Sequence, residues 1–202
     1  VDAGLPALLF VVADAVGTRQ PFFQERLIAA WRRGALSVDE LVAALPEDQL
    51  PAAGVDESIA SLRKVIARLE ALDADTRARV LEPLMTRLDD GHRHMVTVEE
   101  LQRLQDGGVA LGLHGKTHTP MRLAEDLDAE LGGAREALAR QLGQPRARAE
   151  SMSFPHGSFD AAIAQRAREA GYELVFTSVP VLNPTGHGVG WLLGRTGFET
   201  DT

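Results

Sequence analysis

The sequence contains no cysteine among its 202 residues. A chain without thiols forms neither disulfides nor thiolate metal sites. Any bound metal ion must therefore be held by histidine and carboxylate side chains. The lack of cysteine does not decide the cellular compartment.

The sequence also lacks a basic run and a long apolar run. Its formal net charge is -8, so we expect neither nucleic acid nor another anionic polymer as a partner. About 20 apolar residues are needed to span a bilayer, and no basic and apolar leader stands at the start. We therefore expect a soluble protein without a membrane span, with a cytoplasmic location favoured and the oligomeric state open.

What the chain does contain is typical of a globular domain. The hydrophobic content is 45% and the charged content 25%, which is enough for a full core. We expect a single domain over residues 1–202, with a helical insertion at about residues 21–95.

Strands and helices alternate in the predicted secondary structure. The apolar runs predict buried strands at residues 5–13, 109–113, 151–154 and 172–178. Apolar spacing, caps and glycines predict helices at residues 21–34, 37–45, 56–72, 73–88, 97–107, 124–142 and 160–170. We expect Pro83 to kink or divide the fourth helix and Gly132-Gly133 to interrupt the sixth. This alternation predicts an α/β fold with parallel strands, the first of them covered on both faces.

Two histidines, His114 and His118, follow the strand at residues 109–113. Gly115 and Pro120 argue against a helix, and Gly115 also occupies the place where a helical zinc protease needs Glu. The pair therefore lies on a loop at the carboxyl end of a strand, where active sites of α/β folds assemble. Two imidazoles supply half of a tetrahedral metal shell, although two histidines can also share a surface loop without any function.

Several motifs in order resemble the polysaccharide deacetylase family, also called the NodB homology domain or carbohydrate esterase family 4. They are Gly4-Leu-Pro-Ala-Leu-Leu-Phe-Val-Val12, Gly108-Val-Ala-Leu-Gly-Leu-His-Gly-Lys-Thr-His118, Ser153-Phe-Pro-His-Gly-Ser-Phe-Asp160, Ala167-Arg-Glu-Ala-Gly-Tyr-Glu-Leu-Val-Phe-Thr-Ser178 and Leu193-Gly-Arg195. They are similar to the family's second strand, its His-(Ser/Thr)-x-x-His metal motif, its groove motif, the unit that follows, and its late Leu-Pro-Arg segment.

The resemblance implies a distorted (β/α) barrel of the NodB type with fewer than eight strands. It implies a hydrolase that removes N- or O-linked acetyl groups from a carbohydrate with one divalent metal ion, commonly Zn2+. His114 and His118 would be the two imidazole ligands. The groove residues that would bind substrate are Pro155, His156, Gly157 and Phe159.

The sequence departs from the family at the catalytic carboxylates. The family's third ligand and general base are adjacent aspartates on the strand before residues 5–13, and only Val1 to Gly4 precede that strand here. Asp14 and the Asp89-Asp90 pair are weak substitutes, and His92 and His94 are expected to be solvated. His156 replaces a tyrosine and could contact substrate or metal, and His187 is a weak candidate for the missing general acid.

Two interpretations follow from this departure. In the first, the chain is an enzyme whose first strand and aspartate pair lie upstream of Val1; the absence of an initiator Met favours it. In the second, it is a catalytically inactive deacetylase-like domain that binds glycan or a protein partner. A third possibility is that the three histidines 114, 118 and 156 hold a metal for another hydrolysis.

Overall fold

The computed structural model describes residues 4–18, 22–51, 54–144, 149–184 and 190–197. The chain divides into two compact units. The first, which we call the sheet unit, comprises residues 1–18 and 95–202, and the second, the helical unit, comprises residues 19–94. These limits lie close to those predicted for the helical insertion, and the single-domain organisation of residues 1–202 remains a prediction.

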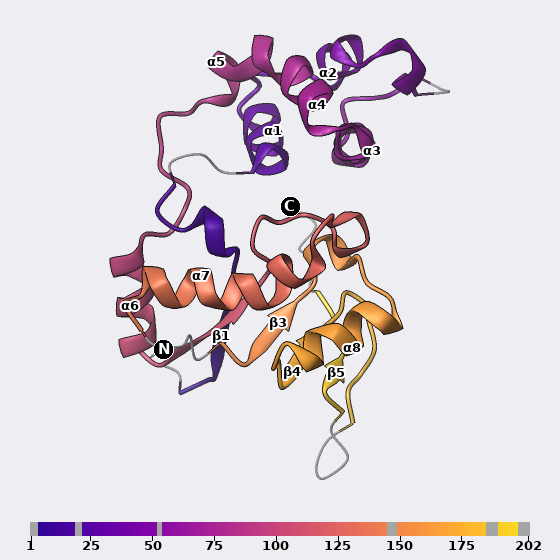
Figure 1. Cartoon of the computed structure of the whole chain (residues 1–202). Helices are drawn as coiled ribbons and strands as arrows, with labels where there is room; N and C mark the ends of the chain where they lie inside the picture. The colour runs from indigo at the N-terminus through magenta and orange to yellow at the C-terminus, as the bar shows by residue number, and fades with distance from the viewer. Residues whose placement is uncertain (1–3, 19–21, 52–53, 145–148, 185–189, 198–202) are drawn as a thin grey trace. The chain divides into compact units, whose positions relative to one another are not determined.

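The sheet unit is built on one parallel sheet (Figure 1). Its strands are β1 (Ala7–Val11), β2 (Val109–Leu113), β3 (Ser151–Ser153), β4 (Leu174–Phe176) and β5 (Leu192–Leu193). They pair in sequence order, all parallel, with β1 and β5 at the two edges of the sheet in the described residues. This order is that of a βα repeat, so the α/β class with fewer than eight strands is confirmed.

The first strand is less covered than predicted. Leu5 is 68% exposed and Leu8 37% exposed, whereas Val11 is buried. The prediction of a strand covered on both faces is wrong for the first half of residues 5–13. The cause is that β1 pairs with β2 alone in the described part of the sheet, and an edge strand leaves one side open.

Within the described residues, the sheet unit has three α-helices, two of which begin at residues with capping side chains. They are α6 (Val98–Asp106), α7 (Ala134–Gln141) and α8 (Ala161–Glu169), with short helical turns at Ala13–Ala15, Met121–Leu123 and Pro155–Gly157. Thr97 closes a capping box at α6, and the Asp160 carboxylate accepts from the Ile163 amide at α8, as predicted. Figure 1 shows α7 lying along the sheet.

The interruption predicted at Gly132-Gly133 is present as a π turn and not as a break in the helix. Residues Ala129–Gly133 form a π turn that continues directly into α7. Glycine has no side chain to crowd a widened turn, so the Gly132-Gly133 pair fits the π turn without ending the helix. The helix begins a few residues later than Ala124, because the Asp126 carboxylate accepts from the Ala129 amide at 2.9 Å.

The core of the sheet unit lies between the strands and α7. Its fully buried members include Leu113, Leu138, Met152, Phe154 and Tyr172. The Tyr172 hydroxyl donates to the carbonyl of Leu131 at 2.9 Å, which satisfies the one polar atom of this buried ring.

The helical unit has a core of its own. Its helices are α1 (Phe23–Arg32), α2 (Val38–Ala44), α3 (Ile59–Ala71), α4 (Ala74–Leu81) and α5 (Met85–Leu88), with short turns at Glu47–Gln49 and Glu82–Leu84. Pro83 lies in the turn between α4 and α5, so the predicted division is confirmed. Leu27, Leu41, Leu62 and Leu69 are among its most deeply buried side chains.

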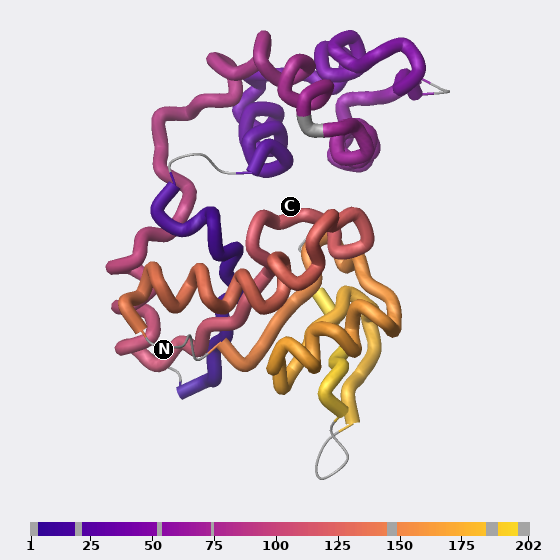
Figure 2. Tube along the Cα trace, viewed as in Figure 1, coloured from indigo at the N-terminus to yellow at the C-terminus, as the bar shows by residue number. Residues whose placement is uncertain are grey.

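The chain passes between the units twice at one place in the sheet unit (Figure 2). It leaves after Thr18 and returns at Met95. The amide of Gly17 donates to the carbonyl of Val96 at 2.8 Å, so the outgoing and returning segments are joined by a hydrogen bond. Among the described residues, no helix is both long enough and apolar enough to cross a membrane.

Candidate functional site

The candidate site lies at the carboxyl edge of the parallel sheet. The loop of residues 114–118, which we call the histidine loop, follows β2, and the groove turn at residues 155–158 follows β3. The strand pairing places Leu113 beside Met152, so the two loops leave neighbouring strands. This edge is where α/β folds gather their ligands.

His114 is held in one orientation. Its backbone amide donates to the carbonyl of Val11 at 2.8 Å, and its ring Nδ1 lies 2.7 Å from the carbonyl oxygen of Ser153. A carbonyl oxygen only accepts, so Nδ1 must carry the proton and Nε2 keeps its lone pair. That tautomer is the one a metal ligand through Nε2 requires.

Three imidazole rings gather around this point. The ring centroids of His114 and His118 are 5.1 Å apart, and those of His118 and His156 are 4.6 Å apart. The structure therefore brings together the two histidines of the metal motif and the histidine of the groove turn. Their roles as ligands or substrate contacts stay predictions.

The surroundings favour the neutral imidazoles. Burial, followed by the charges that His114 and His156 would carry, lowers the pKa of His118 to about 4. Burial also lowers the pKa of His114, with Arg195 and His156 acting in the same direction against the Ser153 hydrogen bond. Neutral rings at physiological pH are what metal coordination requires.

A buried carboxylate fixes the histidine loop. Oε2 of Glu130 accepts from the amides of Lys116 and Thr117 at 2.8 and 3.1 Å, and Oε1 accepts from the Thr117 hydroxyl at 2.6 Å. Glu130 is only 6% exposed. Glu130 was not predicted as a site residue, because nothing local distinguishes it from a surface glutamate of the following helix.

The carbonyls of the loop are fixed by the turn after β1. The amides of Ala13 and Asp14 donate to the carbonyls of Gly115 and Lys116 at 3.2 and 2.9 Å. Gly115 has φ +75°, and a Cβ there would lie 3.0 Å from Oε2 of Glu130. Glycine is therefore required where the family pattern has Ser or Thr.

The groove turn packs against the core, and its histidine is exposed to solvent. Pro155 is buried and His156 exposed. The ring of Phe159 stacks on that of Phe154 with centroids 5.0 Å apart, so it supports the turn from the core side. A Cβ at Gly157 would overlap the Ser178 hydroxyl. Substrate contact by these groove residues stays a prediction.

Arg195 was not predicted as a site residue. Its guanidinium donates to the hydroxyl of the buried Ser153 at 3.1 Å. Ser153 thus connects Arg195, through its hydroxyl, with His114, through its carbonyl. The late segment Leu193-Gly-Arg195 was the one sequence signal that could have indicated it.

The imidazole donors of the histidine loop suit a divalent metal ion, but they are too few to complete its coordination shell. No group of three or more His, Asp or Glu side chains within the described ranges is arranged to hold a metal ion. Asp14 follows β1 at the same edge and is exposed. The histidine loop therefore offers two oriented imidazoles, and the described residues supply no complete shell.

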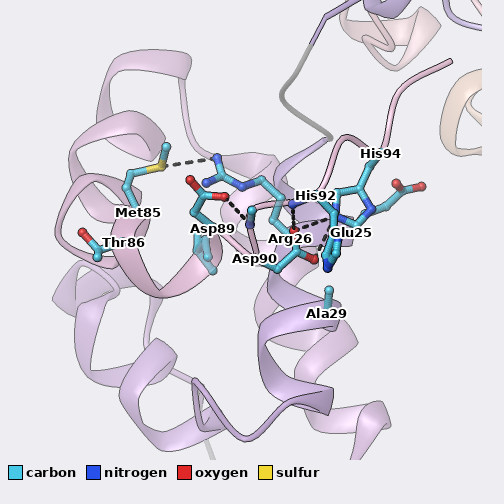
Figure 3. Close-up of a pocket in the computed structure, with 11 residues that line it drawn as sticks. Glu25, Arg26, Ala29, Met85, Thr86, Asp89, Asp90, His92 and His94 are labelled. Atoms are coloured by element: carbon cyan, nitrogen blue, oxygen red, sulfur yellow. Dashed lines mark hydrogen bonds and ion pairs between the residues drawn. The ribbon is translucent and has the colours of Figure 1, made fainter. Parts of the chain in front are cut away.

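The other predicted candidates lie elsewhere. Asp89, Asp90, His92 and His94 belong to the helical unit, where they line a pocket (Figure 3). His94 is exposed as expected, yet its Nε2 lies 2.9 Å from both carboxylate oxygens of Asp90. His187 lies outside the described residues.

Comparison with known proteins identifies a family that part of the chain matches. The family model described as polysaccharide deacetylase matches residues 77–175, a range that contains the histidine loop and the groove turn. This part of the chain is thus similar to the polysaccharide deacetylase family, as its motifs indicated. No curated protein gives a significant match.

The chain is also similar to solved deacetylase structures. A polysaccharide deacetylase from Bacillus cereus is 18% identical with a TM-score of 0.43, over 61% of this chain and 43% of that one. The deacetylase PplD from Streptococcus pyogenes, solved with acetate, has the same identity and TM-score over 94% of this chain and 90% of that one. A de-N-acetylase from Aggregatibacter actinomycetemcomitans is 15% identical with a TM-score of 0.41, over 95% of this chain and 94% of that one. The chain thus spans less than half the length of the Bacillus cereus protein.

Proposed function

We propose that the protein is a metal-dependent hydrolase that removes acetyl groups, N- or O-linked, from a carbohydrate. The observation that carries the proposal is the gathering of His114, His118 and His156 at the carboxyl edge of the sheet, in a chain that is similar to the polysaccharide deacetylase family. In this proposal His114 and His118 bind one divalent ion, for which Zn2+ is the best match because both donors are imidazoles.

The metal would supply Lewis-acid chemistry at the acetyl carbonyl. The protein residues prepare for it. The hydrogen bond from Nδ1 of His114 to the Ser153 carbonyl leaves the lone pair of Nε2 available. Glu130 keeps the backbone of the histidine loop in place. His156, exposed beside His118, would contact the sugar from the groove turn.

A second function is favoured by one specific observation. In the described part of the cluster no carboxylate stands among the three imidazoles to take a proton from water. The same edge would then bind an acetylated glycan, or a protein partner, without hydrolysing it.

Elemental analysis of chelator-free protein separates the two functions. We expect near-stoichiometric metal in the parent chain, and its loss in His114→Ala and in His118→Ala. His92→Ala, which removes an imidazole from the helical unit, is the control and should keep the metal. Acetate release from acetylated oligosaccharides then tests catalysis.

Absence of metal from the parent would overturn the metal-dependent proposal and leave the binding function. Stoichiometric metal without acetate release would also favour the non-hydrolysing function, in a protein whose metal site is occupied.

A further inference from the structure

The helical unit contains a pocket of its own, of about 760 Å³. It lies between α1, α5 and residues 89–94, all within the helical unit. Figure 3 shows the Arg26 side chain extending from α1 toward Met85 and Asp89, while Glu25, which also lines the pocket, lies on the side of His92 and His94. Its volume is in the range of small-ligand sites, about 300–1,000 Å³.

The negative charge of Asp90 is already compensated by neighbouring groups. The carboxylate of Asp90 contacts Nε2 of His94 at 2.9 Å and Nη1 of Arg33 at 3.5 Å, and it accepts from the His92 amide at 3.0 Å. The His94 hydrogen bond, the His92 amide and then the Arg33 charge lower the pKa of Asp90 to about 2. Asp90 therefore shapes the pocket wall.

Other polar groups in the pocket make few or no hydrogen bonds to the described residues. In the described residues, the Arg26 guanidinium contacts a protein acceptor at one place, the thioether of Met85 at 3.5 Å, and sulfur is a weak acceptor. Asp89 accepts one hydrogen bond, from the Gly91 amide at 2.9 Å. Neither the Glu25 carboxylate nor the ring nitrogens of His92 have a hydrogen-bond partner in that part of the chain. Strong donors and strong acceptors thus face one cavity together.

The mixture of charges restricts the ligand class. An anion would meet the carboxylates of Glu25 and Asp89, and a cation would meet the guanidinium of Arg26. An apolar ligand would strip water from all of these groups without replacing its hydrogen bonds, which is costly. A neutral ligand with many hydroxyls matches both kinds of group, because each hydroxyl both donates and accepts.

We propose that this pocket binds a neutral saccharide unit. The apolar part of the wall, formed by Ala29, Met85 and the buried Leu88, would pack against the C–H face of the sugar ring. The charged side chains would bind its hydroxyls. The proposal goes beyond the deacetylase function, since no group of the histidine loop takes part in it.

The test is an amide NMR titration of the full chain with an N-acetylglucosamine tetramer and with cellotetraose. We expect saturable shifts of the Thr86, Gly91 and His92 amides, with a dissociation constant of about 1 mM. Glu25→Ala and Arg26→Ala should each weaken binding about tenfold, because each removes a charged hydrogen-bonding group. Arg32→Ala, an exposed arginine of the same helix that does not line the pocket, is the matched control and should bind like the parent.

The result is separable from that of the proposed function. His114→Ala should keep the pocket shifts even where it loses metal. The proposal is overturned if neither tetrasaccharide shifts these amides at about 10 mM, if the shifts persist unchanged in both pocket variants, or if inorganic phosphate or spermidine produces them in place of the sugars. Dispersed spectra of the variants check that they are folded.

Discussion

At the residue scale, His118 and His156 share a backbone conformation that L-residues seldom adopt. Their φ angles are +72° and +55°. The left-handed region costs a side chain with a Cβ about 1–2 kcal/mol, and such positions concentrate at functional sites. The hydrogen bonds around the histidine loop offset this cost, so the loop residues and their supports act together.

Glu130 is the residue on which this support depends most. Glu130→Ala leaves the amides of Lys116 and Thr117 without their acceptor, and we expect metal affinity to fall about 10- to 100-fold, as for other residues that orient ligands. Glu130→Gln keeps one acceptor oxygen and should fall between the parent and the alanine variant. Competition with a chelating dye measures the affinity.

Glu136→Ala is the matched control, since Glu136 stands on the same helical segment with its side chain 77% exposed. Equal metal affinity in Glu130→Ala and Glu136→Ala would show that Glu130 does not position the loop.

Gly115→Ala combines two penalties. The new Cβ would stand in the left-handed region and 3.0 to 3.2 Å from Glu130, Pro155 and Met121. We expect the free energy of unfolding to fall by more than about 2 kcal/mol. Gly143→Ala, with φ +64° and open space around the Cβ, carries the backbone penalty alone and should cost about 1 kcal/mol. Urea unfolding compares the two, and equal losses would rule out crowding at Gly115.

The depressed pKa of His118 predicts a pH dependence of stability in metal-free protein. The unfolded chain binds a proton below about pH 6.5, whereas folded His118 binds it only near pH 4. The stabilisation present above pH 6.5 should therefore be lost as the pH falls toward about 4. Urea unfolding at several pH values in a chelator measures it. His118→Asn, which tolerates positive φ, should flatten the slope; an unchanged slope would contradict the assignment.

At the scale of elements, helix ends and strand ends position the site. Most helices begin at residues whose side chains accept from the first turn, such as Ser37, Asp73, Thr97 and Asp160. These caps are local, so the sequence predicts them together with the helices that they start. Helix α6 leads through Gly107-Gly108 into β2, so its start also sets the approach to the histidine loop.

Removal of the α6 cap should be measurable. Thr97→Ala removes the acceptor of the Glu100 amide, at 3.2 Å, and we expect about 1 kcal/mol of unfolding free energy to be lost. Thr97→Ser keeps the hydroxyl and should restore most of it. Urea unfolding gives both values, and an equal loss in the serine variant would assign the effect to packing of the Thr97 methyl group.

The parts of the structure that the sequence did not predict depend on distant contacts. Strand β5 has two residues, too few for a periodic signal, and is defined by its pairing with β4. Spacing and resemblance predicted His114, His118 and His156 as site residues. Glu130 and Arg195 were missed because their partners lie 13 to 42 residues away along the chain. Only the folded sheet brings those groups together.

At the scale of the whole molecule, the two units have separate cores. Leu113→Ala, in the sheet unit, and Leu27→Ala, in the helical unit, each empty a fully buried site and should cost about 2–5 kcal/mol. Hydrogen exchange should then show faster amide exchange chiefly in the unit that carries the substitution. Leu182→Ala, at a residue 95% exposed, is the control. Equal acceleration in both units would mean that they unfold as one.

The hydrogen bond between Gly17 and Val96 has a consequence for how this chain can vary. The exit from the sheet unit and the return to it are anchored side by side. A segment whose two ends meet can be lengthened, shortened or exchanged at small entropic cost to its host. The helical unit is thus inserted between two neighbouring positions of the sheet unit. A short linker joining the same two positions would leave every described contact of the histidine loop in place.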